Sequence, residues 1–202
     1  MNKILKNNYI GCTIRLNRLF GKDGFAVCVA ADYGFMSVPF YNVYYLRKIV
    51  EKVIRGRVDG ILLSPGQILH LSDLFSFRSA PAIMVRCDWI NATRLPVLSE
   101  HILVPSSSLK RMVAIYPRDA IRLGVTAFVS YLFLGYGDSL EAENIKSLAE
   151  LVNECHDVGL PFGIEPIPIG SRITGVNMSK FLEYGVSLSF ELGADFLKVP
   201  YT

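Results

Sequence analysis

The sequence has few of the residues that build disulfide frameworks and zinc sites. Its 202 residues include 4 cysteines and 3 histidines. The cysteines stand far apart, without the paired spacings of a metal site or a disulfide-rich domain, and the histidines show no ligand spacing. We therefore expect reduced, buried thiols in a cytoplasmic protein, and we expect no metal and no other cofactor. These residues are Cys12, Cys28, Cys87, Cys155, His70, His101 and His156.

Charge of one sign and long apolar runs are also scarce. The chain has 21 Lys and Arg and 18 Asp and Glu, a net charge of +3 without a basic cluster, which indicates no nucleic-acid partner. No apolar run reaches the ~18 residues of a membrane span, and residues 1–8 lack the apolar core of a signal peptide, so we expect no membrane partner. Apolar residues are nevertheless abundant, at 51% with a mean hydropathy of +0.34, which favours strands buried on both faces of a parallel sheet.

Short apolar runs alternate with amphipathic stretches about six times, the pattern of βα units. Residues 1–24 are polar and basic and predict a leader that packs against the domain, and residues 89–108 predict an excursion over one end of the sheet. Asp138-Ser139-Leu140-Glu141 is typical of a helix N-terminal cap. The predicted strands are 25–31, 60–64, 81–87, 127–133, 161–165 and a last one around Lys198, and the predicted helices are 42–55, 70–77, 117–123, 138–158 and 178–192.

Two architectures compete for this pattern. A doubly wound sheet would have a Gly-rich phosphate turn after an early strand, but the first strand ends in Asp32-Tyr33-Gly34-Phe35. A TIM barrel places its chemistry at the carboxyl ends of several strands, where this sequence has Asp32, Asp88, Glu165 and Lys198. We therefore predict a single α/β domain over residues 1–202, a (β/α)8 TIM barrel of which about six βα units are present.

Lys198 is the most informative residue of the last strand. Side chains alternate across a strand, so Leu197 and Val199 share one face and Phe196 and Lys198 the other. Because both faces look buried, desolvation would disfavour the ammonium and leave a free amine, which can attack a carbonyl and form a Schiff base. Alternatively, Lys198 extends to solvent at the strand end, or pairs with Asp195.

Five segments carry a resemblance to a known family: Ile14–Phe20, Val27–Gly34, Asp119–Gly124, Leu134-Gly135 and Glu191–Lys198. Together they resemble the archaeal-type class I fructose-bisphosphate aldolases of the deoxyribose-phosphate aldolase superfamily, which includes transaldolase-like and thiolase-like members. The resemblance implies a TIM barrel that cleaves or joins carbon–carbon bonds in a phosphorylated sugar or ketose, as a homo-oligomer and without a metal. It also implies that Lys198 is the Schiff-base lysine and that Asp32 assists proton transfers, although Asp32 before Tyr33-Gly34 could be a turn residue.

The sequence departs from the family pattern at three points. Tyr33 stands where the family has a histidine, and Ile167 stands where many members have a proton-donating tyrosine. Glu165, two residues before Ile167 and on the same strand face, is our candidate for the missing acid or base. Alternatively, Glu165 pairs with Lys198 or an arginine and only holds structure.

The third departure is the number of strands, because the family's seventh and eighth strands, whose loops grip the substrate phosphate, have no counterpart before Thr202. A fragment of a longer chain, a second chain that covers the gap, and a degenerate relative all fit, and we favour the fragment. The open sheet would expose its first and last strands to association. The alternatives to a lyase are a related transferase and a non-catalytic barrel that binds a ligand or assembles with partners.

Four further residues are candidates for substrate binding. Arg86, at the end of the third strand, could hold a phosphate or carboxylate, although a salt bridge to Asp88 is the more ordinary function. Asp88 follows the same strand. Ser171 and Arg172 come after the fifth strand, and position alone places them on the active side of the barrel.

Overall fold

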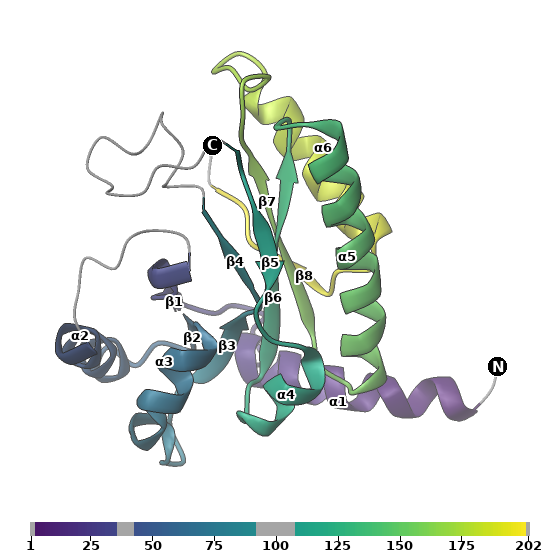
Figure 1. The fold of residues 1–202 in the computed structure, drawn as a ribbon. Coiled ribbons are helices and arrows are strands. Elements are labelled where there is room, and N and C mark those ends of the chain that lie inside the picture. Colours follow the sequence, from purple (N-terminus) through teal and green to yellow (C-terminus); the bar gives the residue numbers. More distant parts are fainter. Residues whose placement is uncertain (1–2, 36–42, 92–107, 201–202) are drawn as a thin grey trace.

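The computed structural model describes residues 3–35, 43–91 and 108–200, of which 3–9 and 43–44 are described by their backbone alone. Six parallel strands form one curved sheet in the order β1-β2-β3-β6-β7-β8, the arrangement of six strands of a TIM barrel (Figure 1). All six pair with parallel register, and β6 and β7 form the longest pairing, from Phe128 opposite Phe162 to Leu134 opposite Pro168. The strands are β1 Cys28–Ala30, β2 Gly60–Leu63, β3 Ala82–Arg86, β6 Ala127–Leu134, β7 Phe162–Pro168 and β8 Phe196–Leu197.

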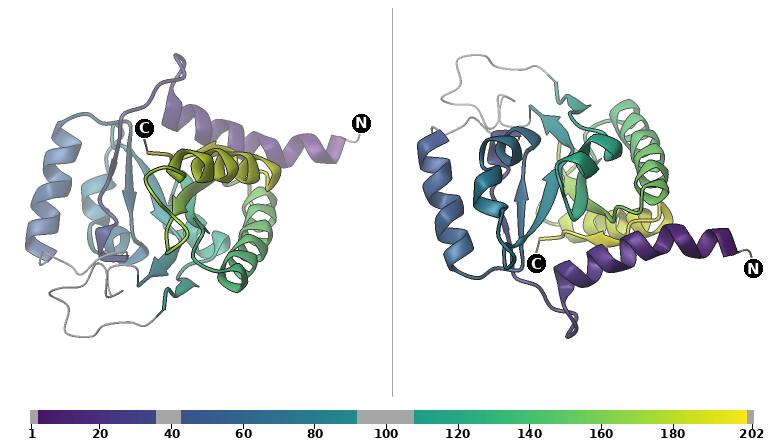
Figure 2. Two further views of the ribbon diagram at one scale, coloured as in Figure 1. Left: turned by 90° about the horizontal axis from the view of Figure 1, so that it is seen from above. Right: turned by 90° about the horizontal axis from the view of Figure 1, so that it is seen from below.

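Helices follow the strands and cover the outer face of the sheet. In both views of Figure 2, α2 and α3 lie beside the β1–β3 half and α5 and α6 beside the other half. The main core lies between sheet and helices, where Ile61, Val85 and Phe128 pack with Leu148 and Cys155 of α5. The helices after the first are α2 Val43–Arg55, α3 Pro65–His70, α4 Pro117–Arg122, α5 Asp138–Asp157 and α6 Met178–Glu191.

The inner face of the sheet carries smaller apolar clusters. Met84 and Val129 belong to a cluster near the amino ends of the strands, and Phe133 and Ile167 to one near their carboxyl ends. Successive side chains of a strand point to opposite faces, so the residues between these clusters on the same face, Arg86 on β3 and Glu165 on β7, lie within the concave side. The fold thus places charged groups at mid-height in an otherwise apolar interior.

The amino-terminal segment is a helix, α1 (Lys3–Phe20), which our sequence analysis predicted only as a leader. It crosses the amino ends of the strands, as Figure 2 shows from below. Leu19 is 2% exposed and packs in the inner-face cluster, and a Cβ on Gly60 would lie 2.7 Å from its Cδ1. Arg15 Nη1 donates to the Gly159 carbonyl at 2.8 Å. The predicted packing against the domain is therefore confirmed.

One predicted helix start is wrong, and at a second helix only the cap residue differs. The helix predicted at 70–77 instead begins at Pro65, because Ser64 accepts from the Gln67 amide and the Gln67 side chain accepts from the Ser64 amide, a capping box. Only a 3-10 turn, Ser72–Phe75, follows it. The predicted start of α5 at Asp138 is confirmed, but the cap residue is Gly137, and the Asp138 carboxylate accepts from Arg172 at 2.7 Å instead of capping the helix.

An antiparallel hairpin lies beyond the carboxyl end of β3. Strand β4 (Asp88–Ile90) pairs with β5 (Arg111–Val113), and Asp88 stands opposite Val113. The sequence predicted an irregular excursion over residues 89–108, most of which lies outside the described residues. The hairpin places Asp88 and Arg111 next to the carboxyl ends of β3 and β6.

Candidate active site

Four of the seven predicted site residues meet on the concave side of the sheet, three at or just beyond the carboxyl ends of strands and Glu165 in the middle of β7. Asp32 follows β1, Arg86 ends β3, Glu165 lies on β7 and Lys198 follows β8. Arg86 Nε donates to Asp32 Oδ2 at 2.7 Å, Arg86 Nη2 donates to Glu165 Oε2, and Lys198 Nζ donates to Glu165 Oε1 at 2.6 Å. The result is a chain of alternating charges, Asp32–Arg86–Glu165–Lys198, in which two carboxylates balance two cations.

Lys198 points into the concave side as predicted from its strand face, but it is not buried. Its side chain is 43% exposed, while Glu165 beside it is 10% exposed. The reason is its position, because β8 is an edge strand of only two residues and Lys198 comes directly after it. The Lys198 amide still donates to the Ile164 carbonyl at 3.0 Å, which fixes the backbone beside β7.

Asp195 does not pair with Lys198. Its Oδ2 accepts from the Phe162 amide at 2.8 Å and lies 3.1 Å from His156 Nε2, on the helix side of the sheet. These contacts hold the start of β8 against β7 and α5. The carboxylate partner of Lys198 is therefore Glu165.

Arg86 is the buried centre of the site. Its side chain is 0% exposed, and its guanidinium carbon lies 3.7 Å from the centroid of the Tyr131 ring. Burial opposes the charged form, but the Tyr131 phenol and the carboxylates of Asp32, Asp88 and Glu165 together raise the pKa of Arg86 above its ordinary value. For Tyr131, burial raises the pKa of the phenol, and the positive charge of Arg86 only partly opposes this shift. Arg86 is a permanent cation, and its fork joins two carboxylates from strands on either side.

Asp88 is fully buried, and one of its carboxylate oxygens accepts hydrogen bonds from three protein groups. Its Oδ2 accepts from Arg111 Nε at 2.6 Å, from the Ser130 hydroxyl at 2.8 Å and from the Tyr131 amide at 2.9 Å. Its other oxygen, Oδ1, lies 4.0 Å from Arg86 Nη1, and neither atom has a hydrogen-bond partner among the described residues. Asp88 thus ties the hairpin to β6 and adds a carboxylate to the surroundings of Arg86.

Ser171 and Arg172 lie in the loop that follows β7, at the same end of the sheet but outside this cluster. Both are exposed, and Arg172 Nη1 donates to Asp138 Oδ1 at 2.7 Å. That contact raises the pKa of Arg172 and lowers the pKa of Asp138. Ile167, at the position of the family tyrosine, packs in the apolar cluster near the carboxyl ends.

Sequence reasoning missed Tyr131 and Arg111. Tyr131 lies inside a predicted strand, where a tyrosine among apolar residues looks like ordinary core. Its signal is the strand period, which puts it on the inner face with Val129 and Phe133 and thus toward the predicted charged residues. Nothing in the sequence pointed to Arg111, because only the pairing of β4 with β5 brings it next to Asp88.

The described residues contain no group of three or more His, Cys, Asp or Glu side chains arranged to hold a metal ion. Within the same ranges, no helix combines the length and the apolarity needed to cross a bilayer. The described cysteines are all free thiols.

Curated sequences similar to this chain include an uncharacterized aldolase of Saccharolobus solfataricus, 32% identical over 197 residues, which are 96% of this chain and 69% of that protein. A 2-amino-3,7-dideoxy-D-threo-hept-6-ulosonate synthase of Archaeoglobus fulgidus is 28% identical over 193 residues, 95% of this chain and 66% of that protein. The chain therefore spans roughly two thirds of the length of these relatives.

Solved structures show the same fold. An archaeal fructose-1,6-bisphosphate aldolase, with its catalytic Lys covalently bound to the carbinolamine intermediate, has a TM-score of 0.73 at 17% identity and covers 95% of this chain and 71% of that one. A second archaeal fructose 1,6-bisphosphate aldolase has a TM-score of 0.71 at 16% identity, with the same coverage. The sequence pattern of the DeoC/LacD family aldolases matches residues 26–202, and the chain belongs to this aldolase family.

Proposed function

We propose that this protein is a class I, Schiff-base aldolase-type lyase that acts on a phosphorylated sugar or related ketose. The observation that carries the proposal is the 2.6 Å contact between Lys198 Nζ and Glu165 Oε1 on the concave side of the sheet. A half-exposed amine beside a nearly buried carboxylate is open to a substrate carbonyl and has a proton acceptor at hand. The archaeal aldolases of the same fold support the substrate class.

The proposed reaction needs one amine and one acid–base group. Glu165 takes a proton from the Lys198 ammonium, and the free amine adds to the substrate carbonyl. Glu165 returns the proton to the hydroxyl of the resulting carbinolamine, which leaves as water and gives an iminium. Glu165 then takes the proton of the substrate hydroxyl, the carbon–carbon bond breaks, and its electron pair passes to the iminium, which becomes an enamine. Protonation of the enamine carbon and hydrolysis release the second product and restore the amine.

The other site residues have supporting functions in this proposal. Arg86 has no exposed surface, so we assign it the positioning of Asp32 and Glu165 rather than contact with substrate. Asp32 assists proton transfers at the end of β1, and Asp88 anchors the hairpin that borders the site. Ser171 and Arg172, in the exposed loop after β7, are the proposed contacts for the substrate's polar groups. We also propose a cytoplasmic setting, which the free thiols support.

Borohydride trapping tests the mechanism. The chain is incubated with dihydroxyacetone phosphate or fructose 1,6-bisphosphate, reduced, and mapped by mass spectrometry. We expect an adduct on Lys198 and none in Lys198→Met. Glu165→Gln should retain the adduct but lower turnover by about 10²- to 10⁴-fold, the usual contribution of a general acid–base group. Adduct on another lysine, or none with any carbonyl substrate, would disprove the Schiff-base proposal, and unchanged turnover in Glu165→Gln would remove Glu165 from the chemistry.

A transferase of the same chemistry is the second candidate, because the Archaeoglobus relative is named a hept-6-ulosonate synthase. Such an enzyme would form the same Lys198 adduct and pass the enamine to a second carbonyl compound. Release of a free aldehyde product from fructose 1,6-bisphosphate without an added acceptor favours the lyase. Turnover that depends on an added aldehyde acceptor favours the transferase.

A further inference from the structure

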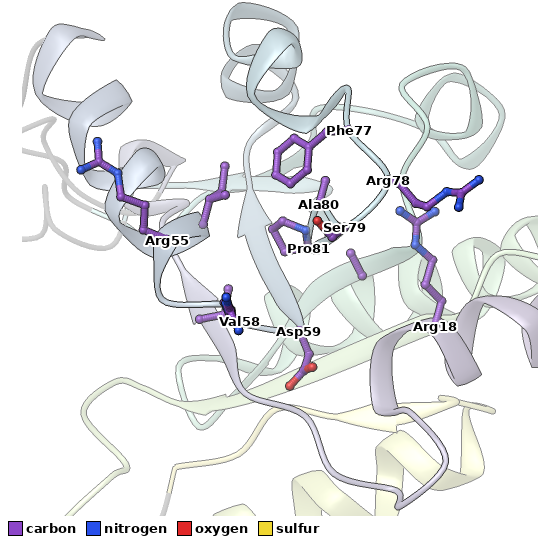
Figure 3. A pocket seen from close by; sticks show the side chains of 12 residues that line it. Arg18, Arg55, Val58, Asp59, Phe77, Arg78, Ser79, Ala80 and Pro81 are labelled. Carbon is purple, nitrogen blue, oxygen red and sulfur yellow. The ribbon is translucent and has the colours of Figure 1, made fainter.

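A second candidate site lies at the opposite end of the strands. A hollow of about 660 Å³ opens at the amino ends of β2 and β3, between the end of α1, the end of α2 and the segment before β3. Figure 3 shows the residues around it. Arg18 of α1 extends toward Arg78, and Arg55 lies on the opposite side of the hollow. Its lining includes Ala82, the first residue of β3, whose last residue is Arg86. At ~3.3 Å per residue, about 13 Å of strand separates the hollow from the Lys198 site.

The charge of this hollow is strongly one-sided. Arg18, Arg55, Arg57 and Arg78 line it, and Asp59 is the one carboxylate among the lining residues. The Asp59 carboxylate already accepts from the Val27 amide at 2.8 Å. The local excess of three positive charges equals the net charge of the whole chain, +3.

The arginines have few partners within the chain. Arg55 lies 3.8 Å from Glu51, one turn earlier on α2. Among the described residues, no salt bridge involves Arg18, Arg57 or Arg78. Four exposed arginines, from the ends of α1 and α2 and from the segment before β3, thus line one concavity with a single carboxylate among them, and this excess of positive charge favours binding of an anion.

The backbone at Arg57 points to the same conclusion. Arg57 has φ of 56°, and no other described residue except glycine has a positive φ. It ends α2 in the left-handed conformation that helices usually give to glycine, although Gly56 stands directly before it. An arginine in this conformation lowers the stability of the fold, so stability does not explain an arginine at this position, and we infer that its side chain binds a ligand.

Apart from Ser79, the remaining lining residues are apolar and suit the body of a small ligand. Ile54, Val58, Phe77 and Pro81 form this part of the wall, and the volume lies in the range of small-molecule sites. We propose that the hollow binds a small phosphorylated molecule, whose phosphoryl oxygens pair with arginines of the lining, Arg57 and Arg78 among them, while its less polar part lies against Phe77 and Pro81. Guanidinium forks match phosphoryl oxygens in pairs, and a single concavity of this volume fits a small molecule better than a nucleic-acid strand.

Calorimetric titration of the full 202-residue chain with inorganic pyrophosphate tests this site without any turnover. We use Lys198→Met as the background, which removes the amine of the other site and makes the result independent of the proposed aldolase function. We expect one pyrophosphate per chain. Arg57→Gly and Arg78→Gln should each weaken binding at least tenfold, and Arg118→Gln, an exposed arginine on α4 outside the hollow, should leave it unchanged.

Arg57→Gly separates binding from folding. Because glycine relieves the left-handed strain, this variant should melt at the same temperature as its parent or higher while losing the anion. Loss of binding together with a lower melting temperature would make Arg57 structural and contradict the proposal. Pyrophosphate affinity that neither Arg57→Gly nor Arg78→Gln changes would also overturn it. Tighter binding of a thymidine dodecamer at several sites per chain would do the same, because it would mark a nucleic-acid surface.

Discussion

At the scale of single residues, the site depends on Arg86 more than on the lysine that performs the proposed chemistry. Asp32 and Glu165 come from strands on either side of β3, and only a buried, forked cation between them can hold both carboxylates. With Arg86 engaging Oε2, Glu165 presents Oε1 to Lys198. The orientation of the Lys198 partner is therefore set from the interior of the sheet.

Replacing Arg86 by Met should be strongly destabilising. The change leaves two nearly buried carboxylates without their cation, and breaking a buried ion pair in this way costs about 3–5 kcal/mol. Urea unfolding measures the loss. Arg86→Lys should be intermediate, because a single ammonium cannot serve both carboxylates in the geometry of a guanidinium fork.

The matched control for Arg86 is the exposed pair of Arg122 and Asp119 on α4, whose side chains are 80% and 58% exposed. Arg122→Met should change the unfolding free energy by less than ~1 kcal/mol, as exposed pairs do. If Arg86→Met also cost less than ~1 kcal/mol, Arg86 would not be the organising cation of the site.

At the scale of elements, the sequence predicts the strands of the main sheet better than the hairpin beside it or the exposure of residues at its edge. Six parallel strands and the meeting of Asp32, Glu165 and Lys198 follow from short apolar runs and from the rule that parallel strands end at one edge. The β4–β5 hairpin could not be predicted, because its strands have only three residues each. The contact that fixes it, between Arg111 and Asp88, joins residues 23 positions apart in the sequence. For Lys198 the sequence left a buried and an exposed side chain open, and the structure has the exposed one, because Lys198 comes directly after an edge strand of two residues.

The shortest strand, β8, depends on a glycine of its neighbour. Gly163 stands directly opposite Phe196, and a Cβ on Gly163 would lie 2.4 Å from the Phe196 ring. Gly163→Ala should therefore push Phe196 away and cost about 1–3 kcal/mol, as overpacking does. Because Lys198 comes directly after this two-residue strand, a displaced β8 would also move Lys198, and we expect the yield of the borohydride adduct to fall.

Two further variants isolate this contact. Gly175→Ala is the control, since nothing lies within 4 Å of a Cβ added there in the β7–α6 loop, and it should leave stability and adduct yield unchanged. Phe196→Leu in the Gly163→Ala background removes the ring that clashes and should restore part of both. A double variant as impaired as Gly163→Ala alone would show that the steric contact is not the cause.

At the scale of the whole molecule, the two ends of the strands have different surroundings. The carboxyl ends carry balanced charges around Arg86, while the amino ends carry the arginine-lined hollow and are crossed by α1, as Figure 2 shows for the helix. Among the described strands, β1 and β8 each pair with a single neighbour. Phe25 and Val27 next to β1 are 79% and 64% exposed.

The family resemblance implies a homo-oligomer, and we predict that pairing of exposed strand edges contributes to it. Unpaired edge strands offer free backbone groups to a second chain, and a lysine on such an edge prevents pairing. Val27→Lys should weaken self-association of the chain at least tenfold, as measured by sedimentation velocity over a concentration series. The Val27 side chain is exposed, so the substitution should leave the melting temperature nearly unchanged.

Val176→Lys is the matched control, because Val176 is 91% exposed but lies in the loop after β7 and not at a sheet edge. It adds the same charge to the molecule and should leave association as in the parent chain. Equal weakening by both substitutions would show that general charge repulsion, not edge pairing, controls assembly. A chain that stays monomeric at every concentration would instead show that the edges are protected, and the homo-oligomer expectation would be wrong.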